Sequence, residues 1–191
     1  MIIDSQGATR RQFLMGLAAS PFVMSSVAQA DEPVDWRKSL LDQDRNLELY
    51  RPSTKERFKF CYWHKDSGFD RDAYLRAVWI LRDAEYDRQK FIDPSLLDSL
   101  WLTQEWLRRE GRNPEIEIYS GYRCPEHNFR LEAAAKQSLH MNGQAADIHV
   151  PGVSTRLLAA MSMVIGAGGV GIYLDKGFVH MDTGRIRTWK G

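Results

Sequence analysis

Three residues in the second half of the chain have the side-chain types of a catalytic metal site: His140, Asp147 and His180. A catalytic zinc ion needs about three protein ligands and one open position for water. Two neutral imidazoles and one carboxylate suit zinc and leave net positive charge, which acidifies a water molecule. We therefore take these residues as candidate ligands of a Zn²⁺ cofactor, although their spacing alone is weak support.

The residues between His140 and Asp147 predict how the first two ligands are positioned. His140 opens a turn, and Gly143 relaxes the backbone within it. Small alanines then lead into a strand that has Asp147 near its start. This part of the sequence therefore predicts a histidine on a turn and a carboxylate at the beginning of a strand.

His180 lies in a second predicted strand, 178–182, close to the C-terminus. Residues two apart in a strand share a face. His180 and Asp182 should therefore point the same way, which makes Asp182 a candidate for catalysis beside the metal.

Hydrophobic periodicity and turn signals predict the remaining elements. Strands are expected at 57–64, from 115 into a loop, at 144–150, 170–173 and 178–182. Helices are expected at 71–87, 93–111, 129–135 and 154–165. Helices mixed with antiparallel hairpins predict one α+β domain, with a small antiparallel sheet flanked by helices.

The first thirty residues have the pattern of an export signal. Arg10 and Arg11 precede an apolar run from Met15 to Val27, and Ala28-Gln29-Ala30 follows as a cleavage site. The twin arginine resembles the signal of the twin-arginine export machinery. We expect cleavage near Ala30, a periplasmic protein and no stable membrane anchor, because the apolar run is short.

The predicted mature chain has a formal charge near zero. Cleavage of the leader removes two arginines, Arg10 and Arg11, and one aspartate, Asp4, which lowers the formal charge by one from the +1 of the whole chain. Nucleic acid as a partner is disfavoured, because it requires a basic face. Cys61 and Cys124 remain, and each is either a small core residue or half of a disulfide in an oxidising compartment.

A longer motif connects these residues to a known family. The string Ser138-x-His140-x-x-Gly143-x-Ala145-x-Asp147 resembles the S-x-H-x-x-G-x-A-x-D signature of zinc D-alanyl-D-alanine peptidases and their hedgehog-like relatives. The SGYR segment at 120–123 resembles an upstream element of that superfamily. Residues 168–189 resemble the C-terminal hairpin of one branch, the exported murein endopeptidase K-like family.

The resemblance implies a fold, a substrate and a role for each matching residue. It implies a hedgehog/DD-peptidase-like zinc peptidase domain over 57–191, after an extended segment at 31–56, with peptidoglycan as substrate. His140, Asp147 and His180 match the zinc ligands. Arg123 matches an arginine that contacts substrate oxygens, which suits carboxylate-rich cell-wall peptides. Zinc and Arg123 would together stabilise the oxyanion formed during amide hydrolysis.

The general base is where this sequence departs from the pattern. Many relatives have a glutamate three residues before the last ligand, where this chain has Gly177, and others have a histidine where it has Phe178. Asp182 is our candidate for the base. The alternative is that Asp182 orients a ligand or caps the following turn. Glu126 and His127 are weaker candidates for lining the cleft.

The other two histidines have less specific interpretations. His149 is two residues beyond Asp147 and would share its face of a strand, either beside the metal ligands or as a buried polar residue. His64 follows an aromatic strand and is expected to be structural or exposed.

The sequence favours a zinc-dependent murein endopeptidase that hydrolyses peptide cross-links in the periplasm. A non-catalytic, zinc-containing peptidoglycan-binding protein is the alternative, because the glutamate is missing. A hydrolase of small D-amino-acid peptides is a third possibility. The bond that is cleaved depends on the shape of the pocket, which the sequence does not show.

Overall fold

The computed structural model describes residues 40, 42–131 and 136–191, which belong to one compact unit, Asp35–Gly191. The predicted export signal lies outside the described residues. Among the residues that are described, no helix has both the length and the apolar character needed to cross a membrane.

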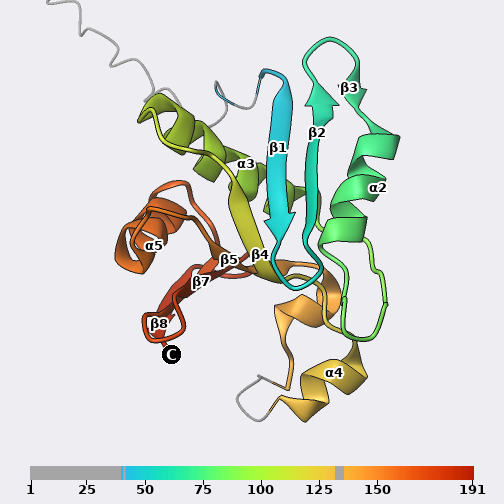
Figure 1. Cartoon of the computed structure of the whole chain (residues 1–191), viewed down its shortest axis with the longest axis vertical. Coiled ribbons are helices and arrows are strands. Elements are labelled where there is room, and N and C mark those ends of the chain that lie inside the picture. Colours follow the sequence, from blue (N-terminus) through green and yellow to red (C-terminus); the bar gives the residue numbers. More distant parts are fainter. Residues whose placement is uncertain (1–39, 41, 132–135) are drawn as a thin grey trace, which may run out of the picture. The chain divides into compact units, whose positions relative to one another are not determined.

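Eight strands form one continuous sheet in the order β3-β2-β1-β4-β5-β7-β6-β8 (Figure 1). The strands are β1 (Arg45–Arg51), β2 (Glu56–His64), β3 (Gly68–Phe69), β4 (Ile116–Ser120), β5 (Ala145–His149), β6 (Gly169–Tyr173), β7 (Phe178–Asp182) and β8 (Arg187–Lys190). The two central pairings that matter for the site are β4 with β5 and β5 with β7, both antiparallel.

The sheet differs from the small antiparallel sheet that the sequence predicts. It is large, and it is mixed, because β1 pairs with β4 in parallel and β6 pairs with β8 in parallel. Strand β1 lies inside the stretch 31–56 that the sequence analysis describes as an extended segment. Its alternating buried residues, Leu47 and Leu49, join the core, so the sheet begins well before position 57.

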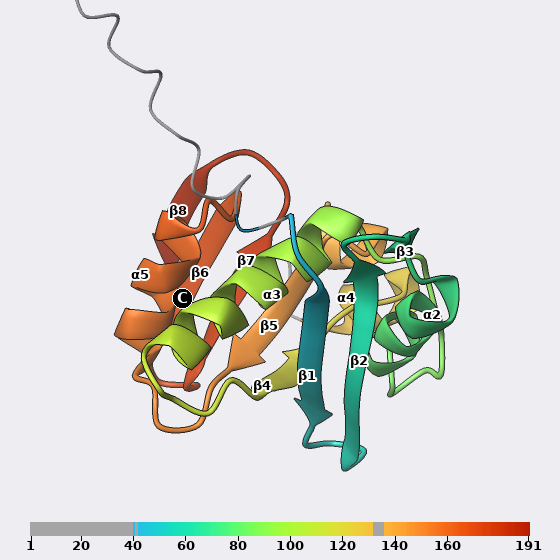
Figure 2. The ribbon, with the colours of Figure 1, turned by 90° about the horizontal axis from the view of Figure 1, so that it is seen from above.

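The helices are α2 (Arg71–Ile80), α3 (Pro94–Arg109), α4 (Pro125–Arg130) and α5 (Thr155–Val164), with a short 3-10 helix η1 (Leu139–Asn142). Helices α2, α3 and α5 pack on the sheet, whereas α4 lies beyond its end (Figure 1). Figures 1 and 2 show α2 beside β2 and α5 beside β6 and β7, at opposite ends of the sheet, with α3 between them. The expected caps are present: the side chains of Asp93 and Ser154 accept N–H bonds at the starts of α3 and α5. Helices α2, α3 and α5 and the sheet enclose the hydrophobic core.

The predicted helix 71–87 is too long, because the observed helix ends at Ile80. The Arg51 guanidinium donates to the carbonyl oxygens of Ile80 and Arg82, at 2.8 and 2.7 Å, and the Tyr122 N–H donates to the carbonyl of Leu81 at 2.7 Å. Three successive carbonyls therefore have partners outside the helix. The carbonyls at the end of a helix lack partners within the helix, and here Arg51 and Tyr122 supply them, so the helix can end at Ile80.

The predicted helix 129–135 begins too late at its N-terminal end, and its last four residues, 132–135, are outside the described part of the chain. Helix α4 begins at Pro125, with Cys124 as its N-cap, and it ends at Arg130. Proline is frequent at the first position of helices, so Pro125 was the local signal that α4 begins there.

Candidate metal centre

His140 lies in the short helix η1, which is followed directly by Gly143. Any other residue in place of this glycine would be strained. Gly143 has a left-handed conformation, with φ of 69°. A Cβ atom at this position would collide with the carbonyl oxygen of Phe91. The Asp93 N–H donates to the Gly143 carbonyl at 2.9 Å and ties the turn to the start of α3. The close approach therefore sets the position of His140.

Asp147 and His180 meet through the pairing of two strands. They are direct partners in the antiparallel register of β5 and β7. Directly opposite residues have Cβ atoms about 4.5–5.5 Å apart and interact through their side chains. The predicted ligands on the two strands therefore lie side by side as a result of backbone hydrogen bonding.

The donor atoms of His140, Asp147 and His180 form a small triangle, and we call these three residues the central cluster. Asp147 Oδ1 lies 3.2 Å from His140 Nε2 and 2.9 Å from His180 Nδ1, and the two nitrogens are 3.0 Å apart. Ligands at tetrahedral zinc are about 3.3 Å apart, from bond lengths of about 2.0–2.1 Å. All three residues are buried. The donor set and its spacing therefore fit a zinc ion.

Each histidine of the central cluster has its second nitrogen held by an oxygen. His140 Nδ1 donates to the carbonyl of Gly121 at 2.6 Å. His180 Nε2 donates to Asp182 Oδ2 at 3.0 Å. These bonds place the hydrogens away from the triangle and leave His140 Nε2 and His180 Nδ1 as electron-pair donors, as in many metal sites.

The electrostatics of the cluster favour an ionised carboxylate next to a neutral imidazole. Burial alone would raise the pKa of Asp147, but His140 and His180 together hold it below its usual range. Burial lowers the pKa of His140. Burial also opposes charge on His180, but the hydrogen bonds to Asp147 and Asp182 outweigh it and raise its pKa. A metal ion at this site would therefore compete with a proton on His180.

Asp182 lies behind the His180 ring, away from the donor atoms of the central cluster. Its carboxylate is buried and accepts N–H bonds from Gly169 at 2.8 Å and Gly184 at 2.9 Å. Arg187 donates to both of its oxygens, at 3.1 and 2.7 Å. Burial would raise the pKa of Asp182, but His180, Arg187 and these N–H groups hold it below its usual range. This placement favours the orienting role over proton transfer.

Arg123 reaches the central cluster from the loop that follows β4. It donates through Nη2 to Asp147 Oδ2 at 2.7 Å and through Nε to Ser120 Oγ at 2.9 Å. The guanidinium therefore holds one oxygen of Asp147 and leaves the other, Oδ1, facing both histidines. Among the described residues these two bonds use Nε and Nη2 of the guanidinium.

The central cluster forms part of the wall of a cavity of about 790 Å³. The cavity is lined by Glu85, Tyr119, Ser120, Arg123, His127, Leu131, Gln137, Ser138, Leu139, His140, Asp147, Tyr173, Lys176, Phe178, His180, Arg187 and Trp189. Its volume is in the range that binds small molecules and peptide segments. The wall combines aromatic side chains with cations, so it can contact both apolar and carboxylate groups.

The family model described as peptidoglycan L,D-endopeptidase MepK matches residues 40–189 of this chain, which include the whole central cluster. The chain belongs to the MepK family. The match begins before β1, in agreement with the place of β1 in the sheet.

Two similar proteins have names that agree with the family. Peptidoglycan L,D-endopeptidase MepK of Escherichia coli K12 is 35% identical over 126 residues, which are 64% of this chain and 68% of the relative. The probable peptidoglycan L,D-endopeptidase MepK of Haemophilus influenzae is 33% identical over 128 residues, covering 65% and 68%. No solved structure gives a significant match.

A third histidine, His127, lines the cavity beside His140 and His180, and it has a buried carboxylate behind it. His127 Nδ1 lies 2.9 and 3.0 Å from the two oxygens of Asp83, and its Nε2 lies 3.2 Å from Glu85 Oε2. Asp83 also accepts the Cys124 N–H at 2.9 Å. The sequence pointed to His127 only weakly and missed Asp83, because these two partners lie 44 residues apart in the chain. It also missed Arg187, although its partner Asp182 is only five residues away.

The remaining candidates lie outside the central cluster. Glu126 is exposed and does not line the cavity. His149 is half-buried, donates to the Gly177 carbonyl at 2.8 Å and stacks on Tyr119. Cys61 and Cys124 are both free thiols, and Cys124 is buried.

Proposed function

We propose that this chain is a zinc-dependent peptidoglycan L,D-endopeptidase that acts in the periplasm. The observation that carries the proposal is the triangle of donor atoms from His140, Asp147 and His180 in the wall of the cavity. Membership of the MepK family and the printed names of the relatives support the substrate and the reaction.

The residues of the central cluster would hold the zinc ion through His140 Nε2, Asp147 Oδ1 and His180 Nδ1. A zinc ion there would supply Lewis acidity for the attack of water on an amide carbonyl. The chain orients the donor atoms in advance, because Gly121 and Asp182 hold the two rings and Arg123 holds the carboxylate. Such preorganisation reduces the reorganisation needed during the reaction.

We assign Asp182 a positioning role, through His180, and Arg123 a role in substrate contact. The Asp182 carboxylate already accepts from His180, Arg187 and two backbone N–H groups. Arg123 presents a nitrogen to the cavity beside Asp147, where it can stabilise negative charge on the attacked carbonyl. His127 lines the same cavity and is our candidate for receiving a proton from water.

The charges of the cavity suit peptides that carry free carboxylates. Arg123, Lys176 and Arg187 all line it. Arg123 and Arg187 are paired with Asp147 and Asp182, whereas Lys176 lies over the Tyr173 ring, 5.7 Å from its centre. We propose that the substrate is a cross-link between two diaminopimelate residues, in which an L-configured carbonyl meets a D-configured amine.

A non-catalytic peptidoglycan-binding protein is the competing function. Gly177 stands where many relatives have a glutamate, and this observation favours it. Digestion of purified sacculi separates the two functions. Mature protein with zinc should convert cross-linked dimers into monomers, measured by chromatography and mass spectrometry, and Asp147→Asn should not.

His149→Gln is the matched control, since His149 is two residues along the same strand and outside the central cluster. It should retain activity. A folded, zinc-loaded wild-type protein that binds sacculi but leaves every dimer intact would establish the binding function instead. The dimers that disappear identify the bond, and loss of D-alanine-linked dimers alone would contradict the L,D assignment.

We also propose export through the twin-arginine machinery, with residues 1–30 as the signal and cleavage near Ala30. The sequence pattern supports this proposal. Replacing both Arg10 and Arg11 with lysine should trap the precursor in the cytoplasm, measured by fractionation and immunoblotting. Normal processing of this variant would contradict the proposed route.

A further inference from the structure

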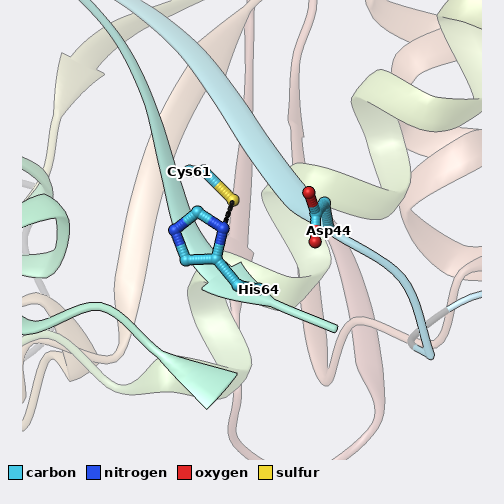
Figure 3. Close-up of side chains that lie close together, drawn as sticks. All are labelled: Asp44, Cys61 and His64. Atoms are coloured by element: carbon cyan, nitrogen blue, oxygen red, sulfur yellow. Dashed lines mark hydrogen bonds between the residues drawn. The ribbon is translucent and has the colours of Figure 1, made fainter. Parts of the chain in front are cut away.

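A second group of metal-ligand side chains lies near the other end of the sheet, and we call it the edge cluster. It consists of Asp44, just before β1, and of Cys61 and His64 in β2. The donor atoms of the three side chains all lie within 4.8 Å of one another. Figure 3 shows the His64 ring directed at the Cys61 sulfur, with Asp44 across from both.

An irregularity in the sheet brings Cys61 and His64 to the same side. The pairing of β2 with β1 shifts register near the start of β1, where Tyr62 is an extra residue in β2. Residues three apart in a regular strand point to opposite faces, but a bulge shifts the alternation by one. Tyr62 and Trp63 both pack toward the core, which leaves Cys61 and His64 together outside it.

The contacts around the edge cluster already orient its donors. Cys61 Sγ lies 3.5 Å from His64 Nδ1. Zinc bonds of about 2.3 Å to sulfur and about 2.0–2.1 Å to nitrogen separate the two atoms by about 3.5 Å at a tetrahedral angle. Asp44 Oδ1 accepts the Lys65 N–H at 2.8 Å, which holds the carboxylate. On the far side of the ring, His64 Nε2 lies 3.6 Å from Asp70 Oδ2.

We infer that Asp44, Cys61 and His64 form a second binding site for a divalent transition-metal ion of the zinc class. Thiolate, imidazole and carboxylate are the three ligand types that zinc uses in proteins. The Cys61 thiol now donates to the Trp63 carbonyl at 3.0 Å. On binding, the Cys61 proton would leave to solvent and a sulfur electron pair would go to the metal. His64 would bind through Nδ1 and keep its hydrogen on Nε2, the nitrogen that faces Asp70.

The charges indicate that a metal ion at this second site would be a weaker Lewis acid than one at the central cluster, with solvent in the fourth position that three side chains leave open. A thiolate and a carboxylate would neutralise a divalent cation, whereas the central cluster would neutralise only half of it. A neutral complex is a poor Lewis acid and a good cross-link between chain segments. The metal would join the residue before β1 to the end of β2, and it does not depend on the proposed catalysis.

Metal titration of the whole mature chain tests the inference with Zn²⁺ and Co²⁺ as probes. The protein is reduced and stripped with a chelator, and bound zinc is measured by mass spectrometry. We expect two zinc ions per wild-type chain and one per Asp147→Asn chain. The Asp147→Asn chain with Co²⁺ should show thiolate-to-cobalt absorption, and the further change Cys61→Ser should remove both the absorption and the remaining ion.

Cys124→Ser is the control, because Cys124 is the other free thiol and lies outside the edge cluster. It should retain the cobalt signal. His64→Ala should lose it, and circular dichroism shows whether each variant is folded. If folded Asp147→Asn binds no zinc or shows no thiolate absorption, or if Cys61→Ser binds as much zinc as its parent, the second site does not exist. A wild-type chain that binds one zinc ion, which Asp147→Asn retains and Cys61→Ser loses, would instead count against the proposed function and leave the second site standing.

Discussion

The central and edge clusters use similar ligand chemistry in very different surroundings. In each, a histidine directs Nδ1 at another ligand and has a carboxylate behind Nε2: Asp182 behind His180 and Asp70 behind His64. At the central cluster this distance is 3.0 Å and the Asp182 side chain is completely buried. At the edge cluster it is 3.6 Å, and the Asp70 side chain is 38% exposed.

The surroundings decide what each cluster can do. The central cluster lies in the wall of a cavity with Arg123 beside it, which is the access that the proposed catalysis requires. The edge cluster is partly exposed and has a neutral ligand balance. Two strands, β1 and β4, separate β2 from β5 in the sheet, so the sites can be changed independently. The comparison indicates that burial, net charge and access matter as much as ligand type.

The largest effect should come from Asp147→Asn, which removes the carboxylate charge from the central cluster. The variant should lose the central zinc ion and at least about 1,000-fold in the rate of dimer cleavage, since metal catalysis contributes several kcal/mol. The rate is measured with purified cross-linked muropeptide, with His149→Gln as the control. Retention of full activity would show that the central cluster is not the reaction centre.

The next effect concerns His127, which lines the same cavity as the central cluster. His127→Gln should lower the cleavage rate about 100-fold and leave zinc binding unchanged, as expected for loss of a general base. The change also leaves Asp83 without its imidazole partner, so thermal unfolding is measured in parallel. Unchanged cleavage by the folded variant would remove His127 from the mechanism.

Asp182→Asn should weaken zinc binding at the central cluster by about 10- to 100-fold, because the residue orients His180. Affinity is measured by competition with a chromophoric chelator, and cleavage is measured at saturating zinc. Substantial activity should return when zinc is in excess. A variant with normal zinc affinity but no activity at any zinc concentration would show that Asp182 is the base after all.

Cys61→Ser should separate the two clusters most cleanly. Cleavage should stay within about twofold of wild type, because β1 and β4 lie between the sites. The stabilisation by zinc, about 2.7 kcal/mol at a concentration 100 times the dissociation constant, should disappear in the Asp147→Asn background. Calorimetry with and without zinc measures it. If zinc raised the unfolding temperature equally in Asp147→Asn with and without Cys61→Ser, the stabilising ion would bind outside the edge cluster.

The smallest effect should come from Asp70→Asn, the edge counterpart of Asp182→Asn. Zinc affinity at the edge cluster should fall less than at the central cluster, by about tenfold or below, because the Asp70–His64 pair is longer and exposed to solvent. Asparagine also retains the N-cap of α2, so stability should change little. A larger loss than for Asp182→Asn would contradict the ranking of the two sites by burial.

Much of the central cluster could be predicted from the sequence because its signals are local. Gly143 after a histidine, alanines before Asp147 and the alternation at His180 and Asp182 all describe neighbours in the chain. The caps at Asp93 and Ser154 are likewise local. Each depends on steric or hydrogen-bonding preferences within a few residues, which any fold of this chain must satisfy.

The tertiary structure decided what depends on distant partners. Helix α2 stops at Ile80 because Arg51, in a strand that the sequence analysis missed, donates to the last carbonyl of the helix, that of Ile80, and to the carbonyl of Arg82 beyond it. Asp182 has an orienting position because Arg187 and the Gly169 N–H converge on its carboxylate. The edge cluster depends on a bulge at Tyr62 in the pairing of two strands. Local preferences set the segments of this protein, whereas the burial and pairing of each polar group come from long-range packing.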